Sequence, residues 1–112
     1  MLSTATDVEI LGRLGKALVD PVRCRLLLAL LDGPGYPADL AEALSVSRSR
    51  LSNHLACLRG CGLVVATPDG RRLRYELADH RLAHALDDLR RVVLAVEADR
   101  GACAQAPSEG CC

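Results

Sequence analysis

Hydrophobic residues recur at helical spacing through the first third of the chain. The first predicted helix carries Leu11, Leu14 and Leu18, three and four residues apart. Asp20 and Pro21 end it and begin a second helix, because aspartate is a good N-cap and proline fits the first helical position. This second helix is expected to run through the apolar segment 26–31, after which the glycines and proline of segment 33–35 break the chain.

The middle of the chain has the order of a helix-turn-helix. Segment 37–44 opens with proline and forms a short helix, and Ser45 and Val46 then make a tight turn. Ser47 is a plausible N-cap for a longer helix, which ends at the glycines of segment 60–62. A short helix, a tight turn and a longer polar-faced helix are typical of a helix-turn-helix motif.

Two short β-strands are predicted after this motif. Residues 63–67 include a β-branched run, segment 68–70 reads Pro-Asp-Gly and has strong turn chemistry, and residues 71–77 alternate in polarity. The alternation puts Leu73, Tyr75 and Leu77 on one face and Arg72, Arg74 and Glu76 on the other. The two strands are therefore expected to form a β-hairpin wing with a basic edge.

The last predicted helix begins near Asp79 and carries an apolar seam. Its members are spaced four, three, four and three residues apart: Leu82, Leu86, Leu89, Val93 and Val96. Such a seam packs either on a like helix of a second copy or on the core of its own chain. Because Tyr36 and Tyr75 are the only aromatic residues, the core must be aliphatic and thin, which favours completion by a second copy.

The predicted fold is mainly α with a β-hairpin wing, in the order α-α-α-α-β-β-α. It is a winged helix-turn-helix over residues 1–100, forming a homodimer through the terminal helices. From residue 101 to residue 112 the sequence loses its periodicity, and this segment is expected to be a flexible, cysteine-containing tail.

The longer helix of the helix-turn-helix motif separates three kinds of side chain. At 100° per residue, Leu51, Leu55 and Leu58 fall within about 60° of one another and form a buried stripe. Ser49, Asn53 and Ala56 lie opposite, where a helix in the major groove meets base edges. Cys57 and Cys61 lie one turn apart on a flank, on the angular strip of Arg50 and His54.

The formal net charge of zero hides a basic segment. Between Ser45 and Tyr75 there are six arginines and one acidic residue, Asp69, which gives this segment a charge of +5 and the remainder −5. A basic face on an otherwise acidic chain is typical of nucleic-acid binding, although a solvated basic face would have the same composition. The predicted DNA-binding residues are Ser47, Arg48, Ser49, Arg50, Ser52, Asn53, His54, Arg71, Arg72 and Arg74.

Six cysteines and the absence of a secretory signal or a long apolar run predict a cytoplasmic protein with reduced thiols and no membrane partner. Cys57 and Cys61 fit two roles, because free cysteines at this spacing are packing residues about as often as ligands. A chelate would need a third sulfur from a distant cysteine, which the tail can supply. Three thiolates favour Cd²⁺, Pb²⁺ or As(III) over Mg²⁺ or Ca²⁺.

Three segments, 18–25, 52–67 and 72–79, together resemble the ArsR/SmtB family of metal-sensing transcriptional repressors, and within it the cadmium- and lead-sensing branch. The resemblance implies that Cys57 and Cys61 bind metal together with Cys103 of the other protomer. It implies Cd²⁺ or Pb²⁺ as effector, with As(III) and Zn²⁺ as further candidates. Auxiliary candidates for the metal are Cys24, Cys111 and Cys112, although Cys24 lies among apolar residues and also suits a packing role.

Two features depart from the family. The tail ends in Cys111-Cys112, which could compete for the third position, form a second site or have no role. The other sensing sites of the family look absent, because segment 40–44 lacks a cysteine pair and the last helix lacks the zinc spacing. The acidic and histidine residues of that helix are His80, His84, Asp87 and Asp88.

The predicted function is a repressor that binds an inverted-repeat operator as a dimer and is released by a soft metal ion. Two alternatives remain open: a thiol-redox repressor, in which the cysteines form disulfides, and a cysteine-based metal carrier. Catalysis is not expected, because Ser52 and His54 have neither a third group to orient the histidine nor a glycine-rich elbow. No organic small-molecule substrate is predicted.

Overall fold

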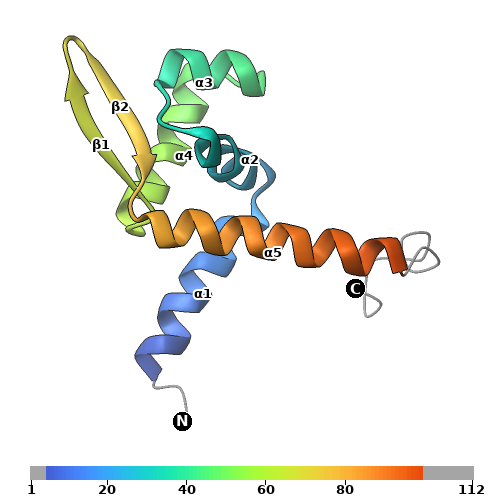
Figure 1. Ribbon diagram of the computed structural model, residues 1–112. Coiled ribbons are helices and arrows are strands. Elements are labelled where there is room, and N and C mark those ends of the chain that lie inside the picture. The colour runs from blue at the N-terminus through green and yellow to red at the C-terminus, as the bar shows by residue number, and fades with distance from the viewer. Residues whose placement is uncertain (1–4, 100–112) are drawn as a thin grey trace.

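The computed structural model describes residues 5–99 of the 112-residue chain (Figure 1). Five α-helices, one 3₁₀ turn and two strands follow one another in this part of the chain. They are α1 Ala5–Val19, α2 Pro21–Ala29, η1 Leu30–Asp32, α3 Pro37–Leu44, α4 Arg48–Gly60, β1 Val64–Asp69, β2 Arg72–Leu77 and α5 His80–Asp99. The predicted winged helix-turn-helix and its element order are confirmed. The second helix is slightly shorter than predicted, because its last turn tightens into η1.

Side-chain caps fix where the helices of the motif begin. The Asp20 carboxylate accepts hydrogen bonds from the backbone N–H groups of Val22 (2.9 Å) and Arg23 (3.1 Å) at the start of α2. These bonds, that of Arg23 first, lower the pKa of Asp20. Ser47 caps α4 in the same way, accepting from the N–H of Arg50 at 3.2 Å. Both predicted caps are therefore confirmed.

The turn between α3 and α4 depends on one residue in an unusual conformation. Ser45 ends α3 with φ of 57° and ψ of 44°, the left-handed conformation that commonly terminates helices. The backbone N–H groups of Ser45 and Val46 then bond the carbonyls of Glu42 (3.2 Å) and Ala41 (3.1 Å). The predicted tight turn at Ser45 and Val46 thus sets the angle between the two helices.

The core is aliphatic and lies between the helix-turn-helix and α2. Its fully buried side chains are Leu26, Leu27, Leu51, Leu55, Leu58 and Val64. The α4 leucine stripe predicted from angular position is therefore buried as expected. Leu40 and Leu44 of α3 also face this core. Tyr75 is the one aromatic side chain among the buried residues of the described segment, so α4 is held almost entirely by leucine packing.

The hairpin is longer than the sequence pattern predicts. Val64 pairs with Leu77 and Asp69 with Arg72, so the turn consists of Gly70 and Arg71 and not of segment 68–70. Gly70 has φ of 63°, and a positive φ at the first of two loop residues is the pattern of a type II′ hairpin turn.

Only part of the predicted apolar face of β2 is covered. Tyr75 is buried and Leu77 is half-buried, whereas Leu73, nearer the tip of the hairpin, is 42% exposed. Tyr75 also exchanges two backbone hydrogen bonds of 2.8 Å with Gly35, which extends the sheet by an isolated bridge. A Cβ at position 35 would lie 3.1 Å from the side chain of Leu40, so the close approach of this segment to α3 favours glycine.

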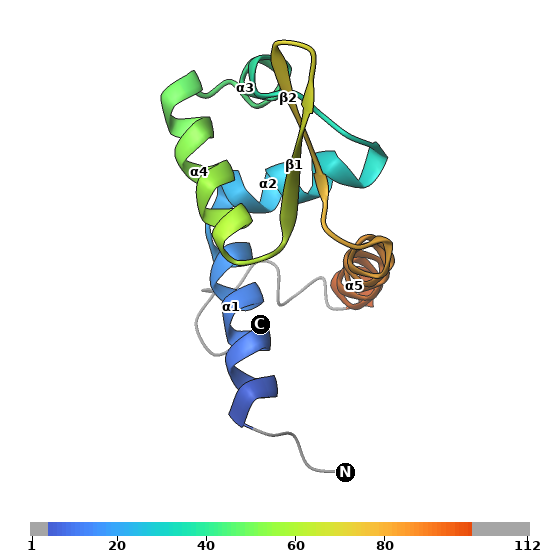
Figure 2. The ribbon, with the colours of Figure 1, turned by 90° about the vertical axis from the view of Figure 1, so that its left-hand side faces the viewer.

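The terminal helices leave much of their apolar surface uncovered. Figure 1 shows α1 and α5 extending away from the body that holds the helix-turn-helix and the hairpin, and Figure 2 shows the same for α1. On α1, Leu11 is 65% exposed, and on α5, Val93 is 60% exposed. Of the α5 seam, Leu86 is buried and Leu82 half-buried against the core, while Leu89, Val93 and Val96 are exposed. No helix in the described part of the chain has the length and apolarity needed to cross a membrane.

Candidate DNA-binding and metal-binding surface

Helix α4 lies along an outer edge of the molecule (Figure 2), and one of its faces is polar and exposed. Ser49, Asn53 and Ala56 are exposed, opposite the buried leucine stripe, as their angular positions predict. Ser52 is exposed as well, and Ser47 combines its capping role with a 3.4 Å contact between its Oγ and that of Ser49. A helix with short polar side chains on an open face has the shape needed for the major groove.

Four arginines around this face are available for phosphate contacts. They are Arg48, Arg50 and Arg59 on α4 and Arg71 at the tip of the hairpin. All four are exposed, and none of them pairs with a carboxylate among residues 5–99. Arg74 of β2 differs, because its Nε is buried and has no hydrogen-bond partner in the described part of the chain.

Arg72 is held against the protein, although the sequence predicts it as a DNA contact. Its Nη2 lies 2.8 Å from Oδ2 of Asp39 on α3, and its guanidinium carbon lies 3.6 Å from the centre of the Tyr36 ring. The Tyr36 hydroxyl donates a 2.6 Å hydrogen bond to Asp69 of β1, which raises the pKa of Tyr36. These four side chains form a clamp that joins both strands of the wing to the start of α3.

The clamp predicts different roles for neighbouring arginines. Arg71→Ala is expected to reduce the slope of log affinity for operator DNA against log salt concentration by about 1, because one phosphate contact is lost. Arg72→Ala is expected to weaken binding with little change in slope, because it releases the wing. Fluorescence anisotropy over a series of salt concentrations measures both quantities. An equal loss of slope in the two variants would instead assign Arg72 to a phosphate.

The side chain of His54 points away from the exposed polar face of α4. Its side chain is 17% exposed, and its Nδ1 lies 4.0 Å from the Asp20 carboxylate at the start of α2. This position is on the flank of α4, as the angular count predicts, but it brings the imidazole to the α2 cap. The DNA contact of His54 therefore stays a prediction, and the orientation of its side chain does not support it.

Cys57 lies in the last turn of α4, and Cys61, one helical turn further along the chain, is the C-cap of this helix. The N–H of Cys61 bonds the carbonyl of Cys57 at 3.0 Å, and the Cys57 side chain is exposed while that of Cys61 is half-buried. The Cys57 Sγ also accepts a 3.3 Å hydrogen bond from Nη1 of Arg23. Cys24 is half-buried on α2. The other predicted ligands, Cys103, Cys111 and Cys112, lie outside the described residues.

This donor pair suits a soft ion but does not complete a site. Two sulfurs at the spacing of one turn can chelate a thiophilic ion, and sulfur discriminates against hard cations. Residues 5–99 contain no group of three or more His, Cys, Asp or Glu side chains placed to hold a metal. A third donor would therefore come from residues beyond this range or from another copy of the chain.

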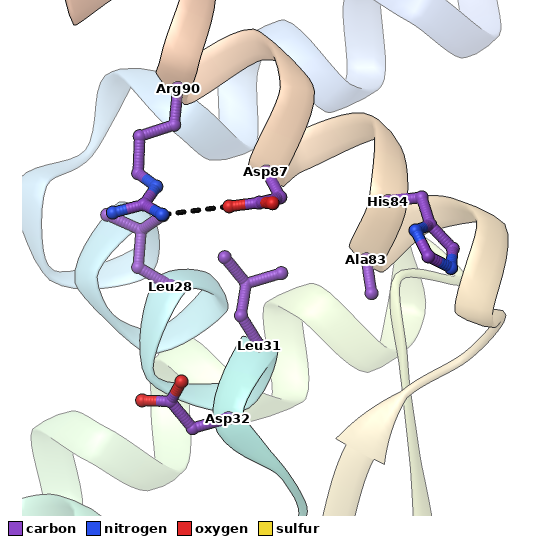
Figure 3. A pocket seen from close by; sticks show the side chains of 7 residues that line it. All are labelled: Leu28, Leu31, Asp32, Ala83, His84, Asp87 and Arg90. Atoms are coloured by element: carbon purple, nitrogen blue, oxygen red, sulfur yellow. Dashed lines mark hydrogen bonds and ion pairs between the residues drawn. The ribbon is translucent and has the colours of Figure 1, made fainter.

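A separate hollow of about 400 Å³ lies between α2, η1 and α5 (Figure 3). It contains Leu28 and Leu31 on one side, and His84 and Asp87 on the other. Figure 3 shows Arg90 reaching toward Asp87, to which it bonds at 2.8 Å, and Arg91 pairs with the same carboxylate at 3.1 Å. The hydrogen bond from Arg90, followed by the charge of Arg91, lowers the pKa of Asp87. Asp87 is thus ionised and paired with two arginines.

Comparison with known proteins identifies the family. Residues 20–65 match the model of bacterial regulatory proteins of the arsR family. Over 110 residues the chain is 56% identical to the HTH-type transcriptional regulator CmtR of Mycobacterium tuberculosis, covering 98% of this chain and 93% of that protein. The chain belongs to the ArsR family. The NMR structure of the cadmium metal-sensor CmtR from the same organism matches with a TM-score of 0.64 and 64% identity, covering 74% of this chain and 86% of that one.

Two further relatives bear on function. One, from Streptomyces lividans, is named a probable mercury resistance operon repressor; it is 38% identical over 109 residues, covering 94% of this chain and 84% of that protein. The other is the homodimeric winged helix-turn-helix DNA-binding domain of Mb0332 from Mycobacterium bovis, with a TM-score of 0.74 and 29% identity, covering 83% of this chain and 84% of that one. The family predicted from the sequence, and its likeness to the cadmium-sensing branch, are confirmed. Transcriptional regulation is not an enzymatic activity.

Sequence reasoning missed three residues of this surface: Arg23, Tyr36 and Asp39. Each acts through a contact with a residue 33 or 34 positions away, so no local spacing marks it. Arg23 lies in a segment that carries the family resemblance, which is a signal of importance but not of role. The tyrosine of the clamp is distinguished in the sequence only as one of two aromatic residues.

Proposed function

We propose that this ArsR-family protein is a metal-responsive transcriptional repressor. It binds operator DNA as a homodimer and releases it when a soft metal ion binds Cys57 and Cys61 of α4 together with Cys103. The observation that carries the proposal is that Cys57, in the last turn of α4, and Cys61, directly after it, lie on the flank of the exposed DNA-reading helix, outside its leucine stripe. The proposed setting is the cytoplasm, where thiols stay reduced.

The DNA-binding part of the proposal follows from the polar face of α4. In each protomer this helix enters a major groove with Ser49, Ser52 and Asn53 toward the bases, while Arg48, Arg50 and Arg71 meet phosphates. A symmetric dimer reads an inverted repeat whose half-sites lie about one helical turn apart. The clamp of Arg72 and Tyr36 holds the wing in the position that this contact needs.

The regulatory part of the proposal follows from the position of the two thiols. When bound, a soft ion such as Cd²⁺ or Pb²⁺ joins the Cys57 and Cys61 sulfurs to a third donor, for which Cys103 of the other protomer is the candidate. The last turn of α4 is then linked to a segment outside the helix-turn-helix. Restraint at one edge of α4 is enough to disfavour the geometry that fits the two half-sites. CmtR is a cadmium sensor, which supports Cd²⁺ as the first ion to test.

The proposal is tested by titrating an operator-bound complex with Cd²⁺, Pb²⁺, As(III) and Zn²⁺ in a gel-shift assay. Cd²⁺ or Pb²⁺ is expected to reduce operator affinity by roughly 5- to 150-fold, which corresponds to a coupling free energy of about 1–3 kcal/mol. Linkage requires DNA to weaken metal binding by the same factor. Unchanged operator affinity at saturating metal would refute the sensor function even if the metal binds.

The same assay separates the alternatives. Release by peroxide that persists in the presence of a chelator would indicate thiol oxidation, although cysteines one turn apart on a helix are poorly placed to bridge without unwinding it. Tight metal binding without any sequence-specific footprint would indicate a metal carrier.

A further inference from the structure

Arg23 connects three helices, α1, α2 and α4. It lies in the first turn of α2, where its backbone N–H bonds the Asp20 cap. Its guanidinium donates to the backbone carbonyl of Lys16 at 3.0 Å through Nη2 and to that of Ala17 at 3.4 Å through Nε. The remaining terminal nitrogen, Nη1, donates to Cys57 Sγ at 3.3 Å. One planar group therefore links α1 to α4.

The contacts with α1 satisfy a general requirement of helix ends. The last four carbonyls of a helix have no partner within it, and Lys16 and Ala17 belong to the last four residues of α1, which ends at Val19. A cation is also favoured at the C-terminal end of a helix dipole. These two contacts fix the guanidinium relative to α1 independently of the state of Cys57.

We propose that Arg23 is the positioning residue that transmits occupation of the Cys57 thiolate to α1; this inference rests on the proposed metal-responsive function. In the proposed site the Cys57 sulfur is joined through the metal to two further donors, which restricts the movement of this sulfur. The same sulfur accepts the hydrogen bond from Arg23. The position of the Arg23 guanidinium is therefore coupled to the metal-bound state of Cys57.

A difference of this kind is what regulation needs. A ligand shifts a conformational equilibrium only by as much as its interactions differ between the two states. Because Arg23 is anchored on α1, restricting the Cys57 sulfur holds the end of α4 more firmly to α1. The apolar surface exposed on α1 belongs to the proposed dimer interface, so the reading helix becomes tied to the dimer frame.

The chain contains a matched control for this role. Arg25 lies on the same helix and also donates to the C-terminal end of another helix, from Nη2 to the carbonyl of Leu44 in α3 at 3.1 Å. Its side chain makes no hydrogen bond to a cysteine in the part of the chain that the structure describes. Both arginines therefore bond carbonyls at the C-terminal end of another helix, but of the two only Arg23 bonds Cys57.

The test compares full-length Arg23→Gln and Arg25→Gln with the parent protein. Operator affinity is measured by fluorescence anisotropy with and without Cd²⁺, and Cd²⁺ affinity of the DNA-free protein by competition with a chromophoric chelator. Arg23→Gln is expected to bind Cd²⁺ and to reduce the ratio of the two operator affinities by at least about fivefold, whereas Arg25→Gln keeps the ratio. A ratio in Arg23→Gln equal to that of the parent protein would overturn the proposal.

Hydrogen exchange of the DNA-free proteins gives a second readout. Cd²⁺ is expected to slow exchange of amides in the last turn of α1 in the parent protein and in Arg25→Gln, but not in Arg23→Gln; equal slowing in all three would also overturn the role of Arg23. If Arg23→Gln does not fold, Arg23→Lys replaces it, because a lysine retains the charge but cannot bridge both helices with one planar group. If the parent protein itself does not respond to Cd²⁺, the proposed function fails, and this inference fails with it.

Discussion

Replacing Cys57 and Cys61 together by serine is expected to abolish the effect of Cd²⁺ on operator binding. The parent protein is expected to lose roughly 5- to 150-fold in operator affinity on saturation, whereas the variant should lose almost none. Serine has nearly the shape of cysteine but lacks the soft sulfur that retains Cd²⁺. Because both side chains lie outside the leucine stripe, the metal-free variant should fold and bind operator DNA as the parent does. Anisotropy titrations at one fixed salt concentration measure these affinities.

Cys24→Ser is the control for this experiment. Cys24 is half-buried on α2 and shares no helix with the reading face, so its substitution should preserve most of the response. Continued release of DNA by Cd²⁺ from the double serine variant would place the regulatory site elsewhere in the chain. Equal loss of the Cd²⁺ response in Cys24→Ser and in the double variant would show that the response does not depend specifically on Cys57 and Cys61.

The sequence alone predicts the helix-turn-helix closely because its signals are local. Proline at position 37 and the caps at Asp20 and Ser47 each act within one helical turn, so residue type and spacing are sufficient to locate the helix starts. The leucine stripe of α4 is equally local, because an angular count needs only the helical repeat. The same count is sufficient to place Cys57 and Cys61 on the flank of the reading face.

Features that depend on distant contacts could not be predicted in this way. The Pro-Asp-Gly segment has strong turn chemistry, yet Asp69 extends the strand because it pairs with Arg72 and accepts the Tyr36 hydroxyl. The contacts of Arg72 with Asp39 and with the Tyr36 ring likewise withdraw it from the set of free arginines. Arg23 is the clearest case, since its importance arises only when folding brings α2 beside the last turns of α4. Alternation and charge counts contain no information on such pairs.

The second large effect is expected at the terminal helices. The radius of gyration is 15.9 Å, compared with about 13 Å for a compact domain of this length, because α1 and α5 project from the body (Figure 1). Their large exposed apolar residues are Val8, Ile10, Leu11, Val19, Leu89, Val92, Val93, Leu94 and Val96. An uncovered surface of this kind on two projecting helices is typical of an interface, and a second copy of the chain offers a matching apolar surface.

Val93→Glu is therefore expected to convert the proposed dimer to a monomer at micromolar concentration. Symmetry introduces the substitution twice, so two unpaired carboxylates would enter an apolar interface, where charge burial is strongly unfavourable. Operator affinity should fall by roughly 10² or more, because the two half-sites are no longer bound by one linked pair of reading helices. Analytical ultracentrifugation measures the association state, and anisotropy measures operator binding.

Ala95→Glu is the matched control, because position 95 lies about 200° around α5 from Val93 and faces away from the seam. It adds the same charge to the same helix and should leave both association and operator binding unchanged. Dissociation of both variants would indicate a general effect of charge on α5, and a Val93→Glu protein that remains dimeric would exclude this part of the seam from the interface.

The metal response provides a further check: if Cys103 of the partner completes the site, a monomeric Val93→Glu protein should bind Cd²⁺ more weakly than Ala95→Glu does. Equal Cd²⁺ affinity in the two variants would instead indicate that each protomer supplies all of its own ligands.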